Sequence, residues 1–123
     1  MRFAETNDSA VYLVQAYGPE GIRVGGRTLT RGLILTPEQI IEDWGPRRIA
    51  DLDPGHLQTL IALSPEVIVL GTGAVQVFPD PALYFAVLER RIGCEVMDTG
   101  AACRTYNILV AEGRRVAAAL LPW

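Results

Sequence analysis

The sequence predicts an α/β protein of three layers, with a central mixed, mostly parallel sheet, flanking helices and a small N-terminal antiparallel β layer. Three observations support this fold class. The first third of the chain contains short β-prone runs separated by glycine-containing turns, the remainder alternates helical and strand patterns, and the late strand patterns are continuously apolar. With 123 residues the chain has the length of one ordinary domain, and we expect residues 1–123 to form a single one.

The N-terminal third has the pattern of a small antiparallel meander. Glycine-containing turns, such as Gly18–Gly21, separate runs that are rich in β-branched and aromatic residues. The expected strands are Val11–Tyr17, Ile22–Val24, Arg27–Leu29 and Leu33–Leu35.

A helix start signal follows the last of these runs. Thr36 can cap a helix whose first residue is Pro37, and Gln39 stands three residues after the cap. We therefore expect a short helix that ends near Trp44, and after it a short strand over Arg47–Leu52.

Two further helices begin with an Asp-Pro pair, the first at Asp53 and the second at Asp80. The first ends before Ser64. The second should end before Gly93, which we expect at the C′ position. Its apolar face is formed by Phe85, Leu88 and Ile92.

Three late segments are expected to be neighbouring core strands, because an unbroken apolar run suits a strand that is covered on both faces. They are Val67–Leu70, Cys94–Met97 and Val116–Leu121. A fourth helix, which Thr99 can cap, is expected from Gly100 to Glu112. Alternating βαβ units imply parallel pairing with right-handed crossovers.

Composition excludes several chemistries. All 11 basic residues are arginine, so no lysine amine is available for a Schiff base, for pyridoxal phosphate or for a P-loop. The net charge of -3 gives no support for nucleic-acid binding. His56 is the only histidine, and no serine stands in a Gly-x-Ser-x-Gly motif. We therefore expect no catalytic set, no cofactor and no metal site.

The two cysteines, Cys94 and Cys103, match no zinc or redox spacing, and we expect both to be reduced core residues. The N-terminus lacks the pattern of a signal peptide, and no apolar stretch approaches the roughly 20 residues of a transmembrane helix. A cytoplasmic protein without membrane insertion is expected.

The candidate binding crevice lies where two expected parallel strands end. Gly71-Thr72-Gly73 follows one strand and Asp98-Thr99-Gly100 follows another, so both loops should meet at the carboxyl edge of the sheet, with Arg104 as the nearest cation. The dinucleotide fingerprint would need a third glycine at Gln76. We therefore interpret the glycines as a turn off the strand end, and Asp98 as an ordinary helix N-cap.

The last helix is apolar on all sides except for a stripe formed by Arg104, Asn107 and Ala111. One interpretation is that Arg104 and Asn107 face a crevice or a protein interface. The alternative is a structural ion pair between Arg104 and an acidic residue such as Asp98 or Glu95. Both interpretations remain open at this point.

Three segments of the chain resemble domain-of-unknown-function family 498. They are Pro65–Gly73, Gly93–Thr99 and Ala102–Val110. Members of this family resemble an archaeal protein of the Mth-938 type and include a mitochondrial complex I assembly factor. The resemblance covers nearly the whole chain and implies a three-layer fold, a central mixed sheet, a smaller β layer and no known enzymatic activity. No mitochondrial targeting segment is found, so the resemblance favours a bacterial cytoplasmic member.

Two functions remain as hypotheses. The first is a non-enzymatic protein-interaction or assembly module, which the resemblance, the lack of a catalytic set and the apolar last helix favour. The second is a small-molecule or anion-binding protein, or a small enzyme, that uses Arg104, Asn107 and the glycine loop. We favour the first, with a protein partner and with self-association as its lesser form.

Overall fold

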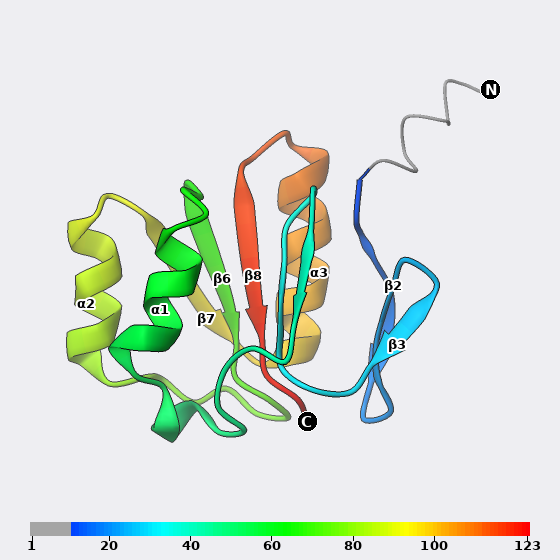
Figure 1. The fold of residues 1–123 in the computed structure, drawn as a ribbon, viewed down its shortest axis with the longest axis horizontal. Helices are drawn as coiled ribbons and strands as arrows, with labels where there is room; N and C mark the ends of the chain where they lie inside the picture. Colours follow the sequence, from blue (N-terminus) through cyan, green and yellow to red (C-terminus); the bar gives the residue numbers. More distant parts are fainter. Residues whose placement is uncertain (1–10) are drawn as a thin grey trace.

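A computed structural model describes residues 11–123, and its central feature is a five-stranded mixed sheet in the order β5-β4-β8-β6-β7 (Figure 1). β8 lies in the middle of this sheet, parallel to β6 on one side and antiparallel to β4 on the other. β6 and β7 are parallel, and β4 and β5 are antiparallel. The sheet is therefore mixed, with as many antiparallel pairs as parallel ones. The strands are β4 (Leu33–Leu35), β5 (Ile40–Glu42), β6 (Val67–Gly71), β7 (Gly93–Met97) and β8 (Val116–Leu120).

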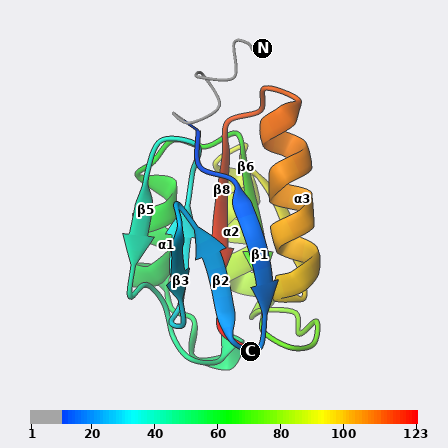
Figure 2. The ribbon, with the colours of Figure 1, turned by 90° about the vertical axis from the view of Figure 1, so that its right-hand side faces the viewer.

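Three strands of the expected N-terminal meander form a separate antiparallel sheet, whereas the fourth, Leu33–Leu35, is β4 of the central sheet and pairs with β8. The separate sheet lies in front of the central sheet in Figure 2 and beside helix α3. Its strands are β1 (Val14–Gly18), β2 (Gly21–Val24) and β3 (Arg27–Leu29).

Helices cover the central sheet on both faces and complete three layers (Figure 1). α1 (Pro54–Ile61) and α2 (Pro81–Glu89) lie on one face, whereas α3 (Thr99–Ala111) and the small sheet lie on the other. Each interface has its own hydrophobic cluster, one with Leu60 and Val87 and the other with Tyr106 and Val24. Among residues 11–123, no helix has the length and apolar character needed to cross a membrane.

The central strand β8 has small side chains in its middle, where Ala117, Ala118 and Ala119 are all fully buried. Side chains alternate between the faces of a strand, so Ala117 and Ala119 face α1 and α2 while Ala118 faces α3. Small residues here let both layers pack closely against the middle of the sheet.

The helix expected after Thr36 does not form, and this prediction is wrong. The cap itself exists, because the Thr36 hydroxyl accepts hydrogen bonds from the N–H groups of Glu38 and Gln39, at 3.2 and 3.0 Å. The chain then turns back as a hairpin, in which Ile40 pairs with Leu35 across β4 and β5. Pairing of β-branched residues with a buried strand overrides the local helix signal.

Three other expectations need correction. The segment Arg47–Leu52 contains a single 3-10 turn over Ile49–Asp51 and no strand. Gly93 is the first residue of β7, while α2 ends at Glu89 and the left-handed residue after it is Arg91, with a φ of 60°.

The strand expected over Cys94–Met97 exists, but β7 forms an edge of the sheet and is only partly buried. The prediction of three neighbouring core strands is thus correct for β6 and β8 and wrong for β7. Cys94 and Val96 of β7 pack against the cluster on the α1 and α2 side and Met97 against the cluster on the α3 side, while Glu95 is exposed.

Candidate functional site

The two loops of the predicted crevice do lie side by side at the carboxyl edge of the sheet. The Thr72 N–H donates to the Met97 carbonyl at 2.9 Å, and the Thr99 N–H donates to the Gly73 carbonyl at 2.9 Å. The spatial prediction that parallel strands bring these loops together is confirmed.

The polar groups that lie between the two loops are hydrogen-bonded within the chain. The buried Thr99 hydroxyl accepts from the Gly73 N–H and donates to the Leu121 carbonyl, each at 2.8 Å. The Thr72 hydroxyl donates to the Val75 carbonyl at 2.7 Å. These groups would be the natural donors for a bound anion, and they are already used within the chain.

The start of α3 is also closed to a ligand. Asp98, and not Thr99, is the N-cap, and its carboxylate accepts the Ala101 N–H at 2.8 Å. A Cβ atom placed on Gly100 would lie 3.1 Å from the Tyr17 ring, so Tyr17 covers this helix terminus. The interpretation of Asp98 as an ordinary cap is confirmed.

Arg104 makes neither of the ion pairs considered from the sequence. Its guanidinium donates a hydrogen bond to the Tyr17 hydroxyl and lies 5.7 Å from the centre of that ring. This hydrogen bond raises the pKa of Arg104 above its usual value. Within residues 11–123, Arg104 forms no ion pair with Asp98 or Glu95.

The Tyr17 ring continues this arrangement by stacking on Trp123, with ring centres 6.3 Å apart and an angle of 14° between the planes. The exposed fractions of Tyr17 and Trp123 are 40% and 37%. Arg104, Tyr17 and Trp123 therefore form an exposed ladder, in which one cation and two aromatic rings come from three distant parts of the chain. We call it the aromatic ladder.

Asn107 joins α3 to β1 of the small sheet and does not face a crevice. Its side-chain amide donates to the Val14 carbonyl and accepts the Val14 N–H, both at 2.9 Å. From the adjacent residue, the Tyr106 hydroxyl donates to the Tyr12 carbonyl at 2.7 Å. α3 is thus packed against the central sheet on one side and against β1 on the other, which explains its apolar character on more than one face.

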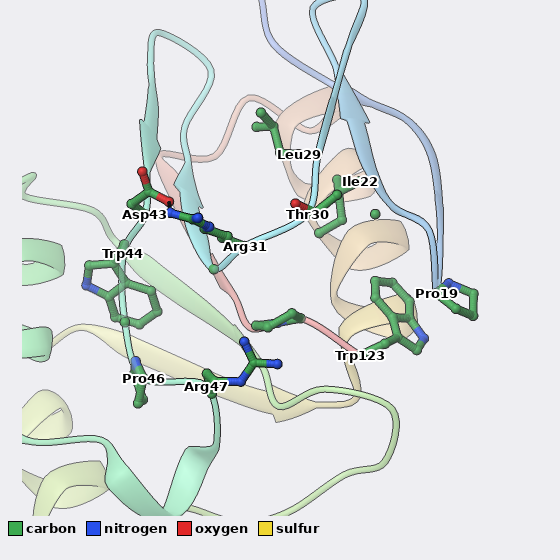
Figure 3. Close-up of a pocket in the computed structure, with 14 residues that line it drawn as sticks. Pro19, Ile22, Leu29, Thr30, Arg31, Asp43, Trp44, Pro46, Arg47 and Trp123 are labelled. Carbon is green, nitrogen blue, oxygen red and sulfur yellow. Dashed lines mark hydrogen bonds and ion pairs between the residues drawn. The ribbon is translucent and has the colours of Figure 1, made fainter.

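A groove of about 350 Å³ adjoins the aromatic ladder, and sequence reasoning did not find it. It lies outside the carboxyl end of β8, between the two sheets (Figure 3). The usable signal was Trp123, an aromatic residue that follows an apolar strand. We call this site the carboxyl-end groove. Its lining comprises Pro19, Gly21, Ile22, Leu29, Thr30, Arg31, Gly32, Asp43, Trp44, Gly45, Pro46, Arg47, Pro122 and Trp123.

A separate aromatic cluster stands on α2 and on the loop before it. The rings of Phe78 and Tyr84 are 4.8 Å apart, and those of Tyr84 and Phe85 are 5.5 Å apart. Phe78 and Phe85 are 54% and 57% exposed, and the nearby Val75 and Val77 are exposed as well. We call these five residues the α2 patch.

The remaining chemistry-bearing side chains have structural roles. Burial raises the pKa of the Cys94 thiol to about 11 and that of Cys103 to about 12, so neither is a thiolate at neutral pH. His56 lies in a capping box with Asp53 at the start of α1. Residues 11–123 contain no group of three or more His, Cys, Asp or Glu side chains placed to hold a metal ion.

The family described as a protein of unknown function (DUF498/DUF598) matches residues 14–121. Similar proteins include NADH dehydrogenase (ubiquinone) 1 alpha subcomplex assembly factor 3 of Danio rerio, which is 37% identical over 120 residues and matches 93% of this chain. The assembly factor of the same name from Homo sapiens is 30% identical over 111 residues, or 89% of the chain. The chain spans 66% and 60% of these two proteins, which is less than two thirds of each.

Bacterial proteins are similar over a larger share of their own length. A crystal structure from Bordetella parapertussis is 42% identical and has a TM-score of 0.86, covering 93% of this chain and 98% of that one. A Mth938-like domain from Bordetella pertussis is 33% identical with a TM-score of 0.83, covering 99% and 92%. A 13 kDa major membrane protein of Francisella tularensis is 31% identical over 90 residues, 72% of this chain and 73% of that protein.

Proposed function

Because this chain belongs to the DUF498/DUF598 family, we propose that it is a non-enzymatic protein-binding module of the assembly-factor type, formed by residues 1–123 as a single Mth938-like domain. Relatives that carry the name of an NADH dehydrogenase assembly factor support this function. We extend the proposal to a role in assembling a respiratory NADH dehydrogenase, in the cytoplasm of a bacterium.

The observation that carries the proposal is the α2 patch. Soluble proteins cover most of their large aromatic side chains, and an exposed aromatic cluster is typical of a protein-binding surface. α2 needs only one apolar face to pack on the sheet, and Val87 provides it with an almost fully buried side chain. Phe85 and its aromatic neighbours are therefore surplus to the packing of the helix and available to a partner.

The aromatic ladder is proposed as a second partner contact. Of the residues expected to form the crevice, Arg104 is the exposed cation, whereas Gly71, Thr72, Gly73 and Thr99 are buried. Arg, Tyr and Trp are the residue types that contribute most at protein interfaces, which supports the assignment of Arg104.

The test is affinity capture from the native organism with three folded forms of the protein: wild type, Phe85→Glu and Arg104→Glu. We expect wild type to recover a specific partner and Phe85→Glu to lose it, because a carboxylate in an apolar interface costs several kilocalories per mole in affinity. Arg104→Glu should weaken capture or leave it unchanged.

The matched control is Glu89→Gln, an exposed substitution on the same helix that removes charge and adds no apolar surface. Sedimentation of each form separates partner loss from loss of self-association. Recovery of no specific partner by a monomeric wild-type protein with reproducible catalytic turnover would contradict the proposal.

A second candidate function, binding of a small molecule or anion, is favoured by one observation. The carboxyl-end groove has the size of a small ligand site, and its Arg47 makes no ion pair with another of residues 11–123. The Asp98 loop, which the sequence suggested for this function, is closed by its own hydrogen bonds.

A further inference from the structure

The carboxyl-end groove lies beside β8, where the central sheet changes from parallel to antiparallel pairing. β8 is parallel to β6 and antiparallel to β4, so the groove outside its carboxyl end has a parallel neighbour on one side only. Ligands of open α/β sheets bind in crevices outside the carboxyl ends of the strands.

The backbone conformation of one turn places the Arg47 side chain at this groove. Asp43 and Gly45 both adopt left-handed conformations, with φ of 55° and 88°, and a Cβ on Gly45 would approach Leu121 to 3.3 Å. The chain leaves this turn through Pro46, and the Arg47 side chain then reaches into the groove toward the side of Trp123 (Figure 3).

Among residues 11–123, two cationic side chains line the groove, Arg31 and Arg47, and one anionic side chain, Asp43. Arg31 is held by Asp43, with Nη1 and Oδ1 3.3 Å apart. No side-chain carboxylate of residues 11–123 lies within ion-pair distance of Arg47. With Arg31 paired, Arg47 is the groove's guanidinium without a carboxylate partner among residues 11–123. One guanidinium balances one negative charge, which fits a carboxylate better than a doubly charged phosphate. Its planar fork also matches the two oxygens of a carboxylate.

The walls of the groove are apolar and aromatic. Pro19 and Pro46 stand at opposite sides, and the Trp123 indole lies across from Arg47 (Figure 3). Trp123 is fixed by its stacking on Tyr17, so the indole offers a preorganised surface to a flat or apolar group.

We propose that the carboxyl-end groove binds a carboxylate attached to an apolar body, with Arg47 holding the carboxylate and Trp123 contacting the body. Two kinds of molecule carry this chemistry: a free organic acid, and the C-terminal residue of a peptide chain. The site is separate from the α2 patch, so the proposal does not depend on the protein-binding function.

The test measures binding to the 15N-labelled protein by NMR, with the indole N–H of Trp123 as the reporter. The probes are the peptide acetyl-Ala-Pro-Phe with a free carboxylate, 3-phenylpropionate, and the amide of each. Variants are Arg47→Gln and, as a matched control, Arg48→Gln, whose exposed side chain points at Asp51 at 4.0 Å and does not line the groove.

We expect at least one of the two acids to shift the Trp123 signal saturably in the millimolar range. Its amide should bind roughly tenfold or more weakly, since a charge-assisted hydrogen bond is lost. Arg47→Gln should show the same loss with the acid, while Arg48→Gln should bind as wild type does.

The two acids distinguish the sources. Saturable binding of 3-phenylpropionate as tight as that of the peptide identifies a free acid, and binding of the peptide alone identifies a chain terminus. Equal binding of acid and amide, wild-type binding by Arg47→Gln, or no saturable shift with either acid would each overturn the proposal.

Discussion

Replacing Thr99 with valine tests whether the loops at the carboxyl edge are a structural junction. The substitution keeps the shape of the side chain and removes the hydroxyl that bridges the Gly73 N–H and the Leu121 carbonyl. Both backbone groups then lack a partner in a buried place. Each such group costs roughly 1–3 kcal/mol, or together about 2–6 kcal/mol. We expect the lower part of this range, about 2–4 kcal/mol, because valine has no hydroxyl that must be desolvated on folding.

The loss is a large fraction of the roughly 5–15 kcal/mol that holds a typical domain together. Urea unfolding followed by tryptophan fluorescence measures it. With a urea dependence of about 2 kcal/mol per molar, the midpoint should fall by about 1–2 M.

The matched control is Thr105→Val on the same helix. The Thr105 hydroxyl contacts only the weakly accepting Met97 sulfur, at 3.3 Å, so its loss should change the free energy of unfolding by less than about 0.5 kcal/mol. If Thr99→Val were as stable as Thr105→Val, the hydroxyl would not be holding the junction and the argument against a ligand there would fail.

Three other predictions address stability and reactivity. The Arg115 N–H and a neighbouring arginine side chain lower the pKa of Glu66, so Glu66→Gln should reduce stability at neutral pH. As the pH falls, the Glu66 carboxylate takes up a proton in the unfolded chain before it does so in the folded protein. The difference in unfolding free energy between wild type and Glu66→Gln, measured with urea, should therefore vanish as the pH falls from the ordinary pKa of 4.5 through the lowered one. Burial raises the pKa of Cys103 to about 12, and iodoacetamide should therefore label it far more slowly in native than in urea-unfolded protein, as mass spectrometry can show. Asn107→Ala should lower the free energy of unfolding by about 1–3 kcal/mol and speed hydrogen exchange of the Val14 amide. Unchanged exchange at Val14 would contradict the role of Asn107 in linking α3 to β1.

The sequence predicted the layers and most elements because their signals are repeated along the chain. Continuous apolar runs locate β6 and β8, and an Asp-Pro pair starts both α1 and α2. The failure at Thr36 has a physical cause, because a helix cap and a hairpin turn make the same local hydrogen bonds. Only the pairing of Ile40 with a buried strand decides between them, and that contact is not encoded locally.

The site was predicted less well than the fold. Strand direction placed the Gly73 and Thr99 loops together, but it could not show that the Thr99 hydroxyl occupies the space between them. The partner of Arg104 was missed because Tyr17 lies 87 positions away, on β1 of the small sheet. The carboxyl-end groove combines four separated segments, and no local pattern brings Arg47 next to Trp123.

The position of β8 also constrains the order in which the protein can be assembled during synthesis. β4 and β6 are both synthesised long before β8. The edge of each strand that faces the middle of the sheet stays unpaired until β8 enters between them. A nascent chain that has left the ribosome only as far as α3 therefore holds two half-sheets with unpaired inner edges, which are the surfaces most prone to mispairing. Completion of the sheet depends on contacts between distant segments, so folding should be slow compared with that of a helical protein of equal length. Cells that make this protein quickly would benefit from shielding these edges until Val116–Leu120 emerges.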